Sequence, residues 1–221
     1  MKKSANFCTI IEGADGPTSV FVAGIDKEAG IRGMKHKIRS WSYRKKREKI
    51  KAKITAGAHS IEEVIAYMQE KYHAVEVPKD SEEWRELRKC CKQNLVQKYH
   101  PELIGEDLKI EKPDITDEQS VRAFLKQMQA QQDAAAGVPE ALFPMDYHIF
   151  RITVKNQGEI EFEIEKQHAH FSASSSTVKK GRRKQVQQVV KDIYQYYGVS
   201  GQDIAQNSER YMMFVSVLAD E

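Results

Sequence analysis

The segment YHIFRITVKNQGEIEFEIE, residues 147–165, carries the clearest structural signal in the chain. Its apolar and polar residues alternate, and its last seven residues, EIEFEIE, alternate without an exception. A period of two places the apolar side chains on one side of a strand and the glutamates on the other. A turn at residues 155–158 separates the two halves, so the segment predicts an antiparallel hairpin of strands 147–154 and 159–165.

Helical spacing prevails on both sides of this hairpin. The segments rich in helix formers are residues 34–54, 61–73, 81–98, 117–135, 185–197 and 200–206. Residues 24–33 are expected to form a glycine-rich linker, 74–77 and 168–173 short strands, and 208–219 a helix or a strand. Helix N-termini are expected where a Ser, Asp or Thr precedes a Glu or Gln by three positions, at Ser60 with Glu63, Asp80 with Glu83 and Thr116 with Gln119.

These elements predict an α+β fold that is helix-rich, with a small antiparallel sheet packed by helices. We expect an N-terminal part, residues 1–57, and an α+β body, residues 58–221. Three cysteines make no disulfide framework, which is typical of the reducing cytoplasm. No apolar stretch approaches the length of about 18 residues that a membrane span requires, and no secretory signal follows the first residues. The sequence therefore predicts a soluble, cytoplasmic protein.

The net charge of +3 is distributed very unevenly along the chain. Residues 1–54 contain 14 Lys or Arg and 5 Asp or Glu, a balance of +9, and the remaining residues carry −6. Within the expected basic helix, residues 35–53, aromatic side chains interleave with cations, a pattern that suits phosphate neutralisation and base stacking. The candidate polyanion-binding residues are Arg39, Trp41, Arg44, Lys45, Lys46 and Arg47. A second basic cluster, residues 179–184, is expected to extend this patch. Alternatively, the basic patch pairs within the chain with the hairpin glutamates, Glu159, Glu161, Glu163 and Glu165.

A second motif lies near the N-terminus, where residues 10–24 read IIEGADGPTSVFVAG. The segment resembles the β subunits of sodium-translocating decarboxylases of the oxaloacetate, methylmalonyl-CoA and glutaconyl-CoA types. Those subunits carry GGADGPT followed by an Ile or Val next to a Phe. Residues 13–18 and Phe21 match that run, whereas Glu12 stands where the family has its first glycine. The remaining chain is not matched.

The resemblance implies an ion site. Asp15 is then the sodium-binding carboxylate, Thr18 a further oxygen ligand, and Gly13 and Gly16 interrupt the helix so that backbone carbonyls reach the ion. Because the family's β subunit spans the membrane many times, the implied role is an accessory or relative of that system, with decarboxylase components as partners and no pumping alone. Whether the chain is an enzyme stays open. An Asp-Gly-Pro turn between two short strands is the structural alternative.

Other residues that bear reactive groups give weaker signals. His148, His168 and His170 are spaced for neighbouring strands, but no Cys or carboxylate completes a zinc-ligand pattern, so we interpret them as surface histidines. Cys91 is expected in the core and Cys90 partly exposed. Three hypotheses follow: a decarboxylase-related protein acting through Asp15, a module that binds nucleic acid or an anionic surface through residues 35–53, and a non-catalytic interaction protein.

Overall fold

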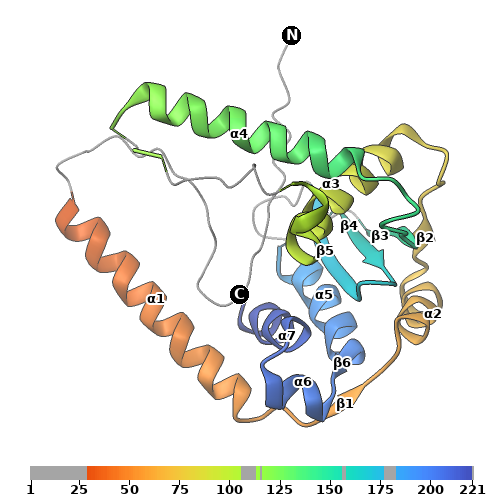
Figure 1. Ribbon diagram of the computed structural model, residues 1–221. Coiled ribbons are helices and arrows are strands. Elements are labelled where there is room, and N and C mark those ends of the chain that lie inside the picture. The colour runs from red at the N-terminus through yellow and green to blue at the C-terminus, as the bar shows by residue number, and fades with distance from the viewer. Residues whose placement is uncertain (1–28, 106–112, 115, 156–157, 177–182, 221) are drawn as a thin grey trace. The chain divides into compact units, whose positions relative to one another are not determined.

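The computed structural model describes residues 29–105, 113–114, 116–155, 158–176 and 183–220, with side chains of the first helix described from Ser40. Its helices are α1 (Ala29–Lys51), α2 (Ile61–Tyr72), α3 (Glu82–Tyr99), the 3-10 helix η1 (Pro101–Leu103), α4 (Glu118–Gly137), α5 (Arg183–Tyr197), α6 (Gly201–Gln206) and α7 (Glu209–Ala219). Its strands are β1 (Gly57–Ala58), β2 (Val75–Glu76), β3 (Tyr147–Val154), β4 (Gly158–Glu165), β5 (His170–Ser176) and β6 (Gly198–Val199). The predicted α+β class, with many helices and a small antiparallel sheet, is confirmed (Figure 1).

The hairpin predicted at residues 147–165 forms as β3 and β4. It lies in the middle of a sheet with the strand order β2-β3-β4-β5, and β1 pairs with β6 in a separate antiparallel ribbon. The third strand was expected at 168–173 but begins at His170. The physical reason is local, because the Glu165 carboxylate accepts the backbone N–H of His168 at 2.7 Å and keeps that residue in the preceding turn.

The chain forms two compact units, and β3, β4 and β5 each contribute residues to both. One unit consists mainly of Glu76–Phe150 and Glu163–Ser172, in which α3 packs against α4. Its core comprises Val77, Cys91, Leu95, Val96, Ala135, Val138, Phe143, Tyr147 and Ile149. Burial of Cys91, with Cys90 only half-buried, confirms the expected orientation of the two cysteines.

The other unit consists of the described residues of Ile11–Val75, Arg151–Phe162 and Ala173–Glu221. Within it, α1 packs against α7, α2 against α5, and α5 against α7. Its buried apolar side chains include Val64 and Met68 of α2, Ile193 of α5 and Val215 of α7. Residues 208–219, which the sequence left between helix and strand, therefore form a helix with one buried side.

The helix N-termini test the capping predictions. The Ser60–Glu63 capping box is confirmed, with both reciprocal hydrogen bonds present. At α3 the predicted cap Asp80 is wrong, because the hydroxyl of Ser81 accepts the Trp84 N–H at 3.2 Å.

At α4 the predicted cap Thr116 is also wrong. The Thr116 hydroxyl donates to the Asp114 carboxylate at 2.7 Å and is therefore engaged outside the helix. The Asp117 carboxylate takes its place and accepts the backbone N–H groups of Gln119 and Ser120. Cap identity depends on which side chain the backbone aims at the first turn.

Two further boundaries differ from the sequence predictions. α1 begins at Ala29 and continues through Gly30 and Gly33, so the linker predicted at 24–33 is wrong over the residues described. α4 continues to Gly137, because Ala135 is fully buried in the core and holds the alanine-rich end in the helix. None of the described helices is long and apolar enough to cross a bilayer.

Candidate functional site

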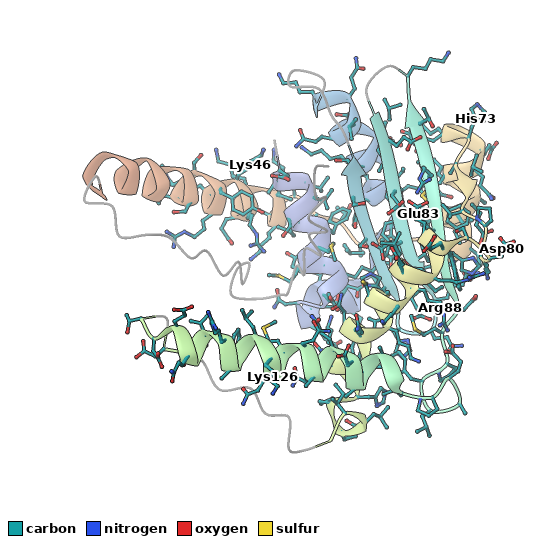
Figure 2. All side chains as sticks on the ribbon, turned by 90° about the horizontal axis from the view of Figure 1, so that it is seen from above. Lys46, His73, Asp80, Glu83, Arg88 and Lys126 are labelled. Carbon is teal, nitrogen blue, oxygen red and sulfur yellow. The ribbon has the colours of Figure 1, made fainter. Side chains whose placement is uncertain are left out.

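The helix α1 concentrates positive charge. Ten of its 23 residues are Lys or Arg, and Glu48 is its one acidic residue. Lys49 and Lys51 in the last turn interact favourably with the negative end of the helix dipole, and Lys51 pairs with Glu48 at 3.1 Å. Figure 2 shows Lys46 on this helix. The basic residues in the last turn therefore favour the helix, although Glu48 is the one carboxylate of α1 that can offset its positive charge.

Two aromatic side chains of α1 each make a cation–π contact with a basic residue of the next helical turn. The Lys45 ammonium lies 4.0 Å from the centre of the Trp41 ring, and the Arg47 guanidinium lies 5.9 Å from that of Tyr43. Both pairs are four residues apart, the spacing at which helical side chains meet. Trp41 is 54% exposed, which is unusual for so large an apolar side chain.

The two pairs point in different directions. A helix turns by about 100° per residue, so Trp41 and Tyr43 lie on nearly opposite sides of α1. Arg47 is half-buried and donates to the Met212 sulfur of α7 at 3.9 Å, so this side of α1 approaches α7, although Tyr43 is itself 36% exposed. The exposed side chains on the Trp41 side are Trp41, Arg44, Lys45, Glu48 and Lys49, which we call the α1 outward face.

The glutamates of the hairpin were the predicted internal partner for this helix. Three of them have local partners instead: Glu161 accepts from Arg151 at 2.7 Å and Glu163 from the Tyr147 hydroxyl at 2.7 Å. Glu165 is fully buried and accepts three backbone N–H groups in addition to the Nδ1 atom of His168 at 2.8 Å. These three carboxylates therefore have partners close to the hairpin, whereas Glu159 is exposed, and pairing of the hairpin with the basic helix stays a prediction.

A second lysine–aromatic cluster lies between α2 and α5. The Asp192 carboxylate accepts from the Tyr67 hydroxyl at 2.6 Å, the Tyr72 hydroxyl at 2.7 Å and the Lys71 ammonium at 2.8 Å. Lys71 also lies 4.9 Å from the centre of the Tyr67 ring. The Tyr67 ring also stacks on Tyr196 with ring centres 3.9 Å apart. We call Tyr67, Lys71, Tyr72 and Asp192 the Asp192 cluster.

The electrostatics of the Asp192 cluster indicate a closed network. Burial would raise the pKa of Asp192, but hydrogen bonds from Lys71 and the two tyrosines hold that pKa below its usual value. Burial and the neighbouring carboxylate raise the pKa of Tyr72 to about 12. Every member therefore keeps its ordinary charge state at neutral pH, and the cluster joins two helices without a group suited to proton transfer.

The described histidines and cysteines do not form a metal site. His148 contacts Glu76 at 2.6 Å and Asp146 at 2.8 Å, one through each ring nitrogen. In the described part of the chain, no group of three or more His, Cys, Asp or Glu is arranged to hold a metal ion. Burial raises the pKa of the Cys91 thiol, so that residue stays protonated and unreactive.

Several predicted site residues lie outside the described residues. These are the ion-site residues of the GADGPT motif, Gly13, Asp15, Gly16 and Thr18, and the short strands expected on either side of them. The Arg39 backbone belongs to α1, but its side chain is not described. Of the second basic cluster, residues 179–184, the side chain of Lys184 is described and is exposed.

Comparison with protein-family models, curated proteins and solved structures finds no match to this chain. Among the described residues, the α1 outward face is the candidate functional site, because it combines an exposed aromatic ring with several cations.

Proposed function

We propose that this protein binds single-stranded nucleic acid through the α1 outward face. The observation that carries the proposal is the exposed Trp41 ring with the Lys45 ammonium 4.0 Å from its centre. Among the described residues, no ion pair engages Lys45, so its charge is available to an external anion.

The residue types suit the two parts of a nucleotide. Cations neutralise the backbone phosphates, and an exposed indole offers a flat surface for an unpaired base, worth about 1–3 kcal/mol per stacked base. Arg44, Lys45 and Lys49 flank Trp41 on the same side of the helix. Contact of these three cations with phosphates predicts a slope of about −2 in a plot of log affinity against log salt concentration.

The same face fits a lipid surface less well. Helices that lie in a membrane interface present a broad apolar side with several large hydrophobic residues. Among the side chains of α1 that are described, from Ser40 onward, Trp41 is the one apolar side chain of the α1 outward face, and the half-buried Ile50 lies on the opposite side of the helix. Within this described part of α1, an exposed indole flanked by cations suits base stacking better than membrane insertion.

The proposal is tested by fluorescence anisotropy with a labelled oligothymidylate, using the full chain. We expect binding that weakens as salt rises, and a loss of affinity of about tenfold in Lys45→Glu. Lys126→Glu is the matched control, because Lys126 is an exposed helical lysine on α4 and the charge change is the same (Figure 2). Equal effects of the two variants would contradict the assignment of the surface.

Two further arms separate nucleic acid from other anions. A duplex of the same sequence should bind more weakly than the single strand, because its bases are not available for stacking. Vesicles containing anionic lipid should bind more weakly still. Binding to vesicles without binding to the oligonucleotide would overturn the proposal.

A further inference from the structure

His148, near the start of β3, directs each of its ring nitrogens at a carboxylate. Nδ1 lies 2.6 Å from a carboxylate oxygen of Glu76 on β2, and Nε2 lies 2.8 Å from one of Asp146, the residue before β3. The His148 side chain is only 14% exposed. An ionised carboxylate accepts hydrogen bonds and donates none, so each contact needs a proton on the ring nitrogen. Neutral imidazole has one N–H and imidazolium has two, so both bonds form only when His148 is protonated.

Asp146 is held in place by several groups besides His148. Its backbone N–H donates to the Glu165 carboxylate at 2.8 Å, and its carbonyl accepts the Lys166 N–H at 3.2 Å. The ammonium groups of Lys166 and Lys79 lie 3.7 Å and 4.0 Å from its carboxylate. Burial would raise the pKa of Asp146, but the charge of His148 and these lysines holds that pKa below its usual value. Asp146 therefore keeps cationic partners even when His148 is neutral.

Glu76 depends on His148 more than Asp146 does. The Glu76 side chain is 39% exposed, and among the described residues His148 is its one hydrogen-bond or ion-pair partner. Glu76 lies on β2, which is two residues long and forms an edge of the sheet. Next to it, the backbone N–H of Val77 donates to the Ile149 carbonyl of β3 at 2.8 Å. So short a strand has few contacts with its neighbour, and the bond to His148 is a large part of them.

We propose that His148 is a pH-sensitive latch that holds β2 to β3. Protonated His148 donates to Glu76 and Asp146 together. After it gives up a proton to water, the remaining N–H stays on the side of Asp146, which is the better-held acceptor. The Nδ1 lone pair then faces the Glu76 carboxylate, and because neither group can donate, Glu76 turns into the solvent and β2 loosens.

The direction of the effect depends on which groups change charge. The titratable groups that face His148 and its two carboxylates in the described structure are Glu76, Lys79, Asp146, Glu165 and Lys166. Carboxylates titrate near about pH 4 and lysines near about pH 10, whereas histidine is the residue type that changes charge between about pH 5 and 8. The latch is therefore closed at the acid end of that range and open at the alkaline end.

Hydrogen exchange of the Val77 amide in the full chain tests the latch. Its protection, relative to an unstructured peptide at the same pH, should fall about fivefold as His148 loses its proton between about pH 5 and 8. The ¹⁵N signals of the ring follow that titration, and the carboxyl ¹³C signal of Glu76 should shift with it. Amides of β4, which is not a neighbour of β2, should keep their protection, which separates loosening of β2 from a change in overall stability.

Two variants assign the effect to this pair of residues. His148→Gln and Glu76→Gln should each remove the dependence of Val77 protection on pH. His100→Gln is the matched control and should leave it unchanged, because His100 is an exposed histidine whose Nδ1 lies 2.8 Å from Glu102. Three results would overturn the proposal: Val77 protection that does not vary with pH in the parent chain, a pH dependence retained in both variants, or a His148 ring that keeps both protons at about pH 8.

Discussion

Trp41 with Lys45 on α1 and Tyr67 with Lys71 on α2 are built from the same parts. In both pairs an ammonium from the next helical turn lies near an aromatic ring, at 4.0 Å and 4.9 Å from its centre. They differ in their carboxylates, because Asp192 accepts from both Tyr67 and Lys71, whereas Glu48, the one carboxylate of the α1 outward face, pairs with Lys51. The Asp192 carboxylate joins α2 to α5, whereas no ion pair engages Lys45 among the described residues, and this difference is the basis of the proposed anion binding.

The largest difference is expected in stability. Asp192→Ala removes the acceptor of three donors and should lower the free energy of unfolding by about 2 kcal/mol. Lys45→Ala, on an exposed helix surface, should change it by less than about 0.5 kcal/mol. Urea denaturation followed by circular dichroism measures both. Similar losses in the two variants would mean that the clusters do not differ as described.

For oligothymidylate binding, a change on α1 should have a larger effect than a change in the Asp192 cluster. Trp41→Ala removes the stacking surface and should weaken oligothymidylate binding by about tenfold, equivalent to about 1.4 kcal/mol. Tyr67→Phe, which keeps the ring but removes the hydroxyl bound to Asp192, should leave that affinity unchanged. Anisotropy titrations of both variants at one salt concentration decide the point. A loss of affinity in Tyr67→Phe as large as that in Trp41→Ala would place the binding surface elsewhere.

The dependence of stability on pH gives a further test of the Asp192 cluster. The pKa of Asp192 lies below its usual value in the folded chain, so its contribution is fully present above the unfolded carboxyl pKa of about 3.9. That contribution is lost as pH falls through the lower, folded pKa. As pH falls below about 4, the free energy of unfolding should therefore decrease less steeply in Asp192→Asn than in the parent protein. Identical acid limbs in the two proteins would argue against charge-assisted hydrogen bonds at Asp192.

The smallest effect is expected at the N-terminal motif. If residues 10–24 act as the resemblance implies, sodium at tens of millimolar shifts the NMR signals of Asp15 and its neighbours without changing the stability of either cluster. Asp15→Asn should abolish those shifts, and potassium at equal concentration is the control. An absence of sodium-specific shifts would remove the ion-site hypothesis and leave the α1 proposal intact.

Much of the fold was predictable because its signals are local. The alternation in residues 147–165 and the Ser60–Glu63 capping box are each contained in one short segment of the sequence. Both predictions are confirmed. The caps of α3 and α4 were not, since neighbouring polar residues compete for one backbone N–H and small differences in backbone direction select the winner.

The α1 outward face was likewise predictable only in part from the sequence. The sequence indicated Trp41, Lys45 and their neighbours because aromatic residues interleave with cations in one charged helix. Whether such a pair is exposed could not be read from that pattern. The acceptor that neutralises Lys71 lies 121 residues away, and nothing in residues 61–72 indicates it.

By itself, the amino-acid sequence determined the elements with short periods: the hairpin, most helices, and the concentration of positive charge in α1. The tertiary structure alone decided which charges are neutralised. It placed Asp192 on Lys71, buried Glu165 against backbone N–H groups, and left the α1 outward face without a carboxylate beyond Glu48 among the residues described. The reason is physical, because periodicity acts through neighbours along the chain, whereas charge pairing acts through space between elements that only folding brings together.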